Sequence, residues 1–200
     1  MARRTGLVVL DRDGVLNRML PNPAEPRPDS PLRPEEAQVF PWVPEALARL
    51  TSAGYGLVIA SNQPAAAKGK TTRALLEATH EVILAEAQSA GGVILSSHLC
   101  FHRSEDGCAC RKPRTGLLTE AFQRHAAYLP AESWMVGDRG TDVLTGTAFG
   151  LRTALLGGAP EDFALLEAKA IRPTFLGNDL RDFASLLLSF SASTSGATHV

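Results

Sequence analysis

The fold of this chain is decided by the segment Leu7-Val8-Val9-Leu10-Asp11-Arg12-Asp13-Gly14. Its first four residues are an uninterrupted apolar run, which is typical of a parallel strand buried on both faces. Two carboxylates and a glycine follow at the point where such a strand ends. Because parallel sheets bind ligands beyond the carboxyl ends of their strands, this segment predicts both a sheet and the place of its site.

Further strands and helices alternate along the chain. Strands are predicted over 56–60, 92–97, 133–136, 151–155 and 173–176, and helices from Pro44 to Gly54 and over 71–89, 116–128, 140–149 and 179–188. This alternation predicts an α/β fold, with a doubly wound, Rossmann-like parallel sheet that helices cover on both faces. We expect one domain over 1–188 and a flexible tail over 189–200, which is rich in Ser, Thr, Ala and Gly.

The composition excludes several classes of protein. The 200 residues are 44% hydrophobic and 20% charged, which is a globular and not a disordered composition. A net charge of −1 offers no broad basic face for nucleic acid. No apolar run approaches the roughly 20 residues of a membrane helix. We therefore expect a cytoplasmic monomer that acts on a small molecule, with neither nucleic acid nor membrane as a partner.

One segment is unusually rich in proline. Eight of the 13 prolines lie between Pro21 and Pro44, and such a stretch is extended and stiff. It leaves directly from the end of the first strand. Two interpretations stay open: a surface connection, or a preformed rim beside the ligand site.

Polar side chains also follow the other predicted strands. Ser61-Asn62-Gln63 ends the second strand, Lys112-Pro113 precedes the helix that starts near residue 116, and Gly137-Asp138 through Asp142 follows a later strand. Each piece alone is typical of a turn or a solvated surface. Asp11-x-Asp13-Gly14 alone is also a weak signal, although a calcium loop is excluded because Asn22 stands where its glutamate is needed. Their common place at one edge of the sheet indicates a single site.

In this order, the four segments resemble the four motifs of the haloacid dehalogenase (HAD) superfamily, and the match spans about residues 6–176. The run from Asp11 to Asn17, and the loop that ends in Cys110-Arg111-Lys112-Pro113, are similar to the histidinol-phosphatase branch of subfamily IIIA. The greatest similarity is to phosphatases that act on D-glycero-D-manno-heptose 1,7-bisphosphate. The resemblance implies a HAD-like domain, and the short segments where relatives insert a cap domain leave no room for one.

The resemblance also implies the catalytic roles. Asp11 would be the nucleophile that forms an aspartyl-phosphate, and Asp13 would be the general acid and base. Mg²⁺ would be bound by Asp11, by the backbone carbonyl of Asp13 and by Asp138. Its positive charge would offset the repulsion between the carboxylates of Asp11 and Asp13.

Three further residues have supporting roles in this scheme. Ser61 and Lys112 would hold the oxygens of the transferring phosphoryl group. Asp142 would orient Lys112 or a metal-bound water and would not bind the metal directly.

A sharper local signal is the set Cys100-x-His102-x5-Cys108-x-Cys110, which uses every cysteine of the chain. Four ligands complete a tetrahedron, so the set predicts a structural Zn²⁺ within a zinc loop over 98–112. The alternative is three reduced cysteines in a loop, although this stretch has little core to bury them in. His98 is a rival ligand, but His102 fits the loop of the relatives better.

The substrate is the least constrained part. Candidate substrate-binding residues are Ser61, Asn62, Gln63, Lys68 and Arg111. A sugar bisphosphate is the first choice because Lys68 and Arg111 offer a second anion site, and a bidentate arginine suits a phosphate. The heptose 7-phosphate would then be hydrolysed. Histidinol phosphate or another small phosphomonoester comes next, since the five residues between His102 and Cys108 make a short zinc loop. A nucleic-acid 3′-phosphatase and a catalytically silent binding module are further alternatives.

Overall fold

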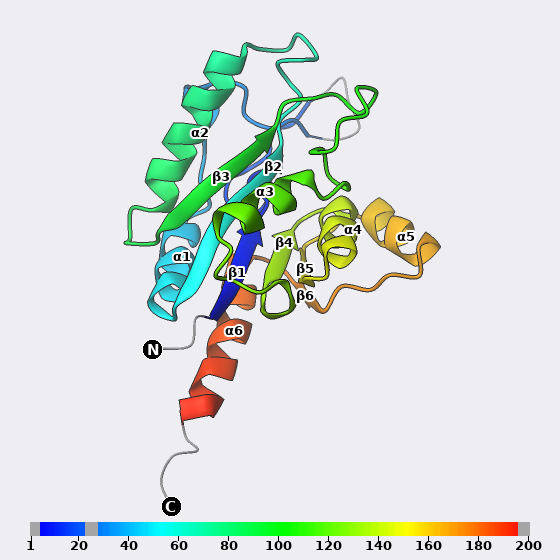
Figure 1. Ribbon diagram of the computed structural model, residues 1–200. Helices are drawn as coiled ribbons and strands as arrows, with labels where there is room; N and C mark the ends of the chain where they lie inside the picture. Colours follow the sequence, from blue (N-terminus) through cyan, green and yellow to red (C-terminus); the bar gives the residue numbers. More distant parts are fainter. Residues whose placement is uncertain (1–4, 23–27, 196–200) are drawn as a thin grey trace, which may run out of the picture.

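A parallel sheet forms the centre of the computed structural model, which describes residues 5–22 and 28–195 (Figure 1). The sheet has the strand order β3-β2-β1-β4-β5-β6, and every neighbouring pair runs parallel. The strands are β1 (Thr5–Leu10), β2 (Tyr55–Asn62), β3 (Ile94–Cys100), β4 (Trp134–Gly137), β5 (Arg152–Leu156) and β6 (Phe175–Gly177). From β1 the chain adds β2 and β3 on one side and then β4, β5 and β6 on the other side. The predicted doubly wound sheet is therefore confirmed.

Helices cover both faces of the sheet (Figure 1). They are α1 (Val43–Ser52), α2 (Arg73–Ala87), α3 (Gly116–Arg124), α4 (Gly140–Phe149), α5 (Pro160–Ala168) and α6 (Leu180–Ser195), with short 3-10 turns at Pro34–Glu36 and Pro130–Glu132. Helices α1, α2 and α6 pack on one face, and α3 packs on the other. Helix α4 contacts β4 and β5, and α5 packs against α4.

The core explains why β1 lies in the middle. Val8 and Leu10 belong to the cluster under α1 and α6, whereas Leu7 and Val9 belong to the cluster under α3. All four side chains are fully buried. Burying such a side chain contributes about 1.5–3 kcal/mol, so the strand that carries the first acidic pair is among the most firmly held parts of the fold.

Two elements differ from the sequence-based expectation. Helix α5 lies in a segment for which neither a helix nor a strand was predicted. Helix α6 continues to Ser195 instead of ending at residue 188, so residues 189–195 of the expected flexible tail are helical. Residues 196–200 lie outside the described part of the chain.

Two segments of the chain could hold an inserted cap domain: the one after the first motif and the one between the second and third motifs. Between β1 and α1, the described residues form isolated bridges and one 3-10 turn, and between Asn62 and Lys112 they form turns, helix α2, strand β3 and the zinc loop. No inserted domain is present among the described residues, as expected. None of the helices in the same residues is long and apolar enough to cross a membrane.

Candidate active site

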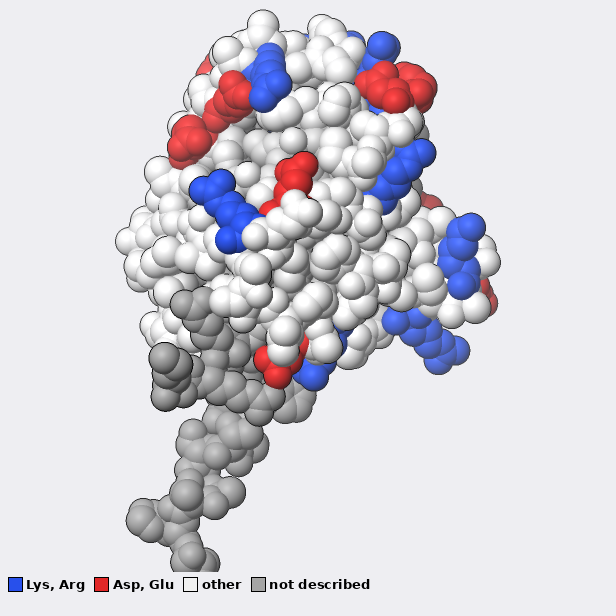
Figure 2. All heavy atoms as spheres, viewed as in Figure 1, with Lys and Arg blue, Asp and Glu red and all other residues white. Residues whose placement is uncertain are grey.

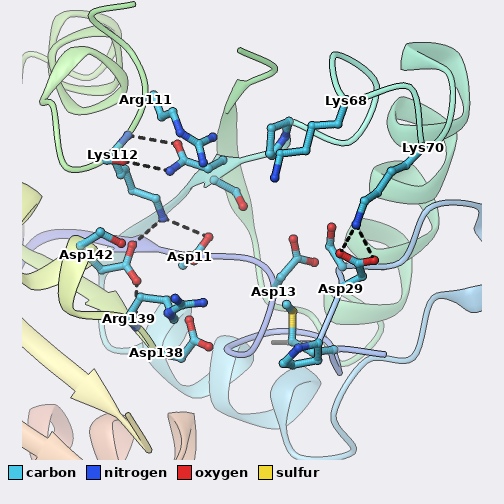
Figure 3. Close-up of a pocket in the computed structure, with 17 residues that line it drawn as sticks. Asp11, Asp13, Asp29, Lys68, Lys70, Arg111, Lys112, Asp138, Arg139 and Asp142 are labelled. Carbon is cyan, nitrogen blue, oxygen red and sulfur yellow. Dashed lines mark hydrogen bonds and ion pairs between the residues drawn. The ribbon is translucent and has the colours of Figure 1, made fainter. Parts of the chain in front are cut away.

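A cavity of about 450 Å³ opens at the carboxyl ends of the central strands (Figure 3). It is lined by Asp11, Asp13, Met19, Pro28, Asp29, Ser30, Ser61, Asn62, Pro64, Lys68, Lys70, Arg111, Lys112, Asp138, Arg139, Thr141 and Asp142. All four predicted motifs therefore meet at one place. The rim includes residues 28–30, so the described end of the proline-rich segment borders the site, while residues 23–27 lie outside the described part.

Lys112 is the central cation of the cavity. Its Nζ lies 3.1 Å from Asp11 Oδ1 and 2.6 Å from Asp142 Oδ1, and it donates to the carbonyl of Ala60 at 2.8 Å. Only 4% of the residue is exposed. Burial alone would lower the pKa of Lys112, but the carboxylates of Asp11 and Asp142 outweigh it and raise the pKa above its ordinary value. The ammonium is therefore charged at every physiological pH.

The backbone of Lys112 is clamped to the end of β2. Asn62 Oδ1 accepts from the Lys112 N–H at 3.0 Å, and Asn62 Nδ2 donates to the Lys112 carbonyl at 3.1 Å. Asn62 was expected to bind substrate, and it does line the cavity. Its amide, however, is occupied by the lysine backbone, so the geometry supports a positioning role.

Three carboxylates gather beside this ammonium. One oxygen from each of Asp11, Asp138 and Asp142 lies within 4.8 Å of the others. Burial, followed by the negative charges of Asp11 and Asp142, raises the pKa of Asp138 to about 9. Asp138 Oδ1 is also buried, and it has no hydrogen-bond partner within residues 5–22 and 28–195. Clustered acidic oxygens with one orphaned atom fit a hard cation such as Mg²⁺, which prefers oxygen ligands.

Asp142 differs from the other two acids. Its Oδ1 pairs with Lys112, and its Oδ2 accepts from the Arg139 N–H at 3.1 Å at the start of α4. Burial is the main cause that raises the pKa of Asp142 to about 6, against the opposing charge of Lys112. Both oxygens are engaged, which agrees with the expected role of orienting Lys112.

Gly14 lets the first and fourth motifs approach each other. Its φ is +84°, in the left-handed region that favours glycine. A Cβ at this position would collide with the carboxylate of Asp138. The glycine thus provides the space in which Asp138 faces Asp11.

Asp13 is held by a buried network that the sequence did not reveal. The Arg12 guanidinium donates from Nε and Nη2 to Asp13 at 3.1 Å each, and Asn17 Nδ2 donates at 2.9 Å. Gln63 Nε2 donates to Asp13 Oδ2 at 2.6 Å and to Ser61 Oγ at 3.1 Å. Arg12 is completely buried.

The network corrects one expectation. Gln63 was expected to contact substrate, but its side chain is fully buried behind the cavity wall and spends its amide on Asp13, Ser61 and Arg12. Ser61, by contrast, lines the cavity. Charged residues such as Arg12 are rarely fully buried, so neither its type nor its position in the sequence pointed to this role.

The rim of the cavity carries several cations. Lys68 and Arg111, the predicted second anion site, both line it, and in Figure 3 both lie on the side opposite Asp138. Arg111 also donates from Nη1 to the carbonyl of His102 at 3.1 Å, which ties it to the zinc loop. Lys70 was not foreseen, and its Nζ pairs with both carboxylate oxygens of Asp29 at 2.8 and 2.9 Å.

The cysteines and His102 form a second cluster beyond Arg111. Five of the six separations among Cys100 Sγ, His102 Nδ1, Cys108 Sγ and Cys110 Sγ range from 3.1 to 3.7 Å, and the four residues' ligand atoms all lie within 4.8 Å of one another. A tetrahedral zinc with Zn–S bonds of about 2.3 Å implies edges of about 3.8 Å, so four ligand atoms are arranged closely enough to hold one ion. The thiols are free. Three thiols and one imidazole suit Zn²⁺ and leave no open position.

The rival ligand His98 points elsewhere. Its Nδ1 faces Glu120 Oε2 at 3.4 Å and its Nε2 faces Ser96 Oγ at 3.0 Å. The preference for His102 over His98 in the cysteine cluster is therefore consistent with the geometry.

Known proteins share this architecture. A family model described as HAD-hydrolase-like matches residues 109–183. The D-glycero-beta-D-manno-heptose-1,7-bisphosphate 7-phosphatase of Bordetella bronchiseptica is 34% identical over 178 residues, which cover 80% of this chain and 92% of that protein. A histidine biosynthesis bifunctional protein HisB of Legionella pneumophila is 33% identical over 136 residues, covering 68% of this chain but 37% of the relative.

Solved structures agree with the sequence relatives. The D,D-heptose 1,7-bisphosphate phosphatase of B. bronchiseptica, crystallised with magnesium and phosphate, superposes with a TM-score of 0.78 at 31% identity and covers 92% of this chain and 99% of that one. The corresponding enzyme of Burkholderia thailandensis gives a TM-score of 0.63 at 32% identity, with coverages of 92% and 99%. The chain therefore belongs to the HAD-like hydrolases, in the family that includes the heptose-bisphosphate 7-phosphatase of B. bronchiseptica.

Proposed function

We propose that this protein is a magnesium-dependent phosphatase that removes the 7-phosphate of D-glycero-D-manno-heptose 1,7-bisphosphate through an aspartyl-phosphate. The relative that is named for this reaction is matched over 92% of its length. One observation carries the chemistry. The carboxylates of Asp11, Asp138 and Asp142 converge within 4.8 Å beside the buried ammonium of Lys112. Such a site binds a cation and a phosphoryl group together.

Asp11 is the proposed nucleophile. Its Oδ1 accepts from the Arg12 N–H at 2.7 Å and pairs with Lys112. The carboxylate is therefore fixed in orientation, and its Oδ2 is left to attack phosphorus in line with the leaving oxygen. A carboxylate held this way forms a covalent intermediate and splits one difficult step into two easier ones.

Asp13 is the proposed general acid and base. It protonates the leaving alkoxide and then takes a proton from the water that attacks the aspartyl-phosphate. Arg12, Asn17 and Gln63 hold its carboxylate at the cavity wall. Lys112 and the Ser61 hydroxyl stabilise the oxygens of the transferring group.

The residues that would hold Mg²⁺ are Asp11, Asp138 and the backbone carbonyl of Asp13. When bound, the ion supplies positive charge that neutralises phosphate oxygens and the acidic cluster. Asp142 is assigned to Lys112 in this proposal, because both of its oxygens are already engaged.

A bisphosphate substrate fits the charges at the rim. Lys68 and Arg111 lie across the cavity from Asp138, and neither has a carboxylate partner in the part of the chain that the structure describes (Figure 3). They would bind the phosphate that is not hydrolysed. The face shown in Figure 2 carries Lys and Arg side chains scattered among Asp and Glu. This mixed surface and the net charge of −1 favour a small metabolite over nucleic acid.

The cysteine cluster would hold a structural Zn²⁺. Cys110 is followed directly by Arg111 and Lys112, so an ion there would fix the start of the basic pair. We also propose that residues 1–188 act as one domain in a cytoplasmic monomer. In support, the acidic site is complete within one chain, and free thiols suit a reducing compartment.

The test is phosphate release with Mg²⁺ from heptose 1,7-bisphosphate, histidinol phosphate and other small phosphomonoesters. The bisphosphate should be turned over with the highest kcat/KM, and Asp11→Asn should abolish release from every compound. Preference for histidinol phosphate would reassign the substrate. No release from any compound would refute the phosphatase.

A further inference from the structure

Three polar side chains converge at a point that belongs to neither the acidic cavity nor the cysteine cluster. Ser96 Oγ, on edge strand β3, lies 3.0 Å from His98 Nε2 and 2.9 Å from His125 Nε2. His98 is on the same strand, whereas His125 is the residue that ends α3. Two imidazole nitrogens from different elements are therefore directed at one oxygen atom.

A carboxylate fixes the protons of this group. Glu120 Oε2 lies 3.4 Å from His98 Nδ1, and because a carboxylate only accepts, His98 carries its proton on Nδ1. His98 Nε2 is then a bare lone pair that accepts from the Ser96 hydroxyl. The Ser96 oxygen in turn accepts from the Nε2–H of His125. The hydroxyl thus fills a small space between two imidazoles.

His98 already has the state of an imidazole that binds a metal ion. Zn²⁺ is bound by the lone pairs of neutral imidazoles, and a ligating histidine usually gives its other N–H to a carboxylate, as His98 does to Glu120. The position is open to an ion, since Ser96 and His125 are half-buried and the Glu120 side chain is 58% exposed.

We propose that His98 and His125 form a second transition-metal site at the place where the Ser96 hydroxyl now lies between them, and that its ion is Zn²⁺. The Ser96 hydroxyl turns away and the ion takes its place. Each Nε2 then approaches to about 2.0–2.1 Å of the ion, roughly 1 Å closer than its present distance to the hydroxyl. The proton of His125 moves from Nε2 to Nδ1, and waters complete the coordination. With only two nitrogen ligands, the ion should be held more weakly than at the cysteine cluster.

The site would bridge two elements that flank the zinc loop. Strand β3 ends at Cys100, and α3 begins shortly after Lys112. An ion that joins His98 to His125 would tie this edge strand to the end of the helix. Because the folded chain would bind it and the unfolded chain would not, added Zn²⁺ should raise the melting temperature in a concentration-dependent way.

The experiment uses the full chain carrying one equivalent of zinc, in saturating Mg²⁺ so that the acidic cavity is occupied. Calorimetric titration with Zn²⁺ should reveal one further equivalent, accompanied by a rise in melting temperature. His125→Ala should remove both, whereas Gln123→Ala, an exposed neighbour on the same helix, should behave as wild type. Glu120→Gln should weaken binding by about 10- to 100-fold.

Two further variants separate the metal site from a purely structural hydrogen-bond network. Ser96→Ala keeps both imidazoles and should retain the second equivalent, while His98→Gln should lose it. The proposal is overturned if the zinc-loaded wild type takes up no further ion, if His125→Ala binds it as the wild type does, or if Ser96→Ala folds but no longer binds.

Discussion

Two groups of side chains could each hold a metal ion: the acidic cluster of Asp11, Asp138 and Asp142, and the cysteine cluster of Cys100, His102, Cys108 and Cys110. The fold positions them in different ways. Asp11 and Asp138 directly follow buried strands, so the sheet brings their charges together whether or not a cation is present. The cysteine cluster lies mainly in the loop between β3 and α3, where His102 is exposed and Cys108 and Cys110 are half-buried.

The difference concerns what an ion would contribute in each place. At the acidic cluster, an ion would relieve repulsion within a structure that forms without it. At the cysteine cluster, it would replace the core that the loop lacks, so that binding and folding of the loop become one event. Removing the first ion should therefore cost activity, and removing the second should cost structure.

The largest effect is expected at the nucleophile. Asp11→Asn removes the attacking oxygen and should lower kcat by about four orders of magnitude or more. The fold should be as stable as before, or more stable, since one of the clustered charges is gone. Phosphate release and thermal denaturation check both points, with Asp29→Asn as the control carboxylate at the rim. A variant that loses stability together with activity would contradict the contrast.

Next in size is the cysteine cluster. Cys110→Ser should abolish zinc binding and increase hydrogen exchange in the loop between β3 and α3. It should lower kcat by about 10- to 100-fold, because Lys112 loses its fixed approach. The Mg²⁺ concentration for half-maximal activity should not change. Metal analysis and kinetics measure this, with Ser104→Ala in the same loop as the control. Full activity in a zinc-free sample would break the proposed link.

A third prediction concerns a buried histidine of helix α2. His80 on α2 is buried, and its ring nitrogens have no partner among the described residues. Burial, and then the charge of Arg12, lowers the pKa of His80 to about 4. Between pH 6.5 and 4 the unfolded chain binds a proton that the folded chain does not. The free energy of unfolding should therefore fall, by up to about 3 kcal/mol, as the pH drops through this range.

Urea denaturation of the wild type and His80→Leu at pH 7 and pH 5 measures this contribution. Loss of zinc at low pH affects both proteins equally, so the difference between them isolates His80. If the free energy of unfolding changes equally in the two proteins between pH 7 and pH 5, His80 takes up its proton in the folded state as readily as in the unfolded state, and the prediction is wrong.

The smallest effect on kcat is expected at Asn62, which holds the backbone of Lys112 between the acidic cluster and the cysteine cluster. Asn62→Ala removes both hydrogen bonds to the Lys112 backbone and should lower kcat about tenfold by letting the ammonium drift. Zinc content and melting temperature should change little. Asn178→Ala, before α6, serves as the control, and equal kcat for the two variants would remove Asn62 from the link.

The sequence predicted those parts that depend on local pattern. Apolar runs located the strands, and the polar residues at their ends were brought together because parallel strands share an edge. Helix α5 was missed because its apolar residues do not repeat on one face. The extension of α6 is not predicted because the Ser- and Ala-rich composition of 189–195 favours a tail, although neither residue breaks a helix.

The network around Asp13 could not be predicted for a different reason. Whether Arg12 is buried, and whether Gln63 faces the cavity or the core, depends on side-chain directions at the ends of strands. Sequence spacing assigns both residues to the correct edge of the sheet but does not decide which of them reaches a ligand.

Gly14 has a consequence for anyone who redesigns this enzyme. The Asp138 carboxylate occupies the space that a side chain at position 14 would need. The loop after β1 and the loop after β4 therefore keep their positions only together. A library that varies the first loop for new chemistry should keep this position fixed. Any other residue at position 14 would collide with Asp138, which lies 124 positions further along the chain, so such variants would be inactive.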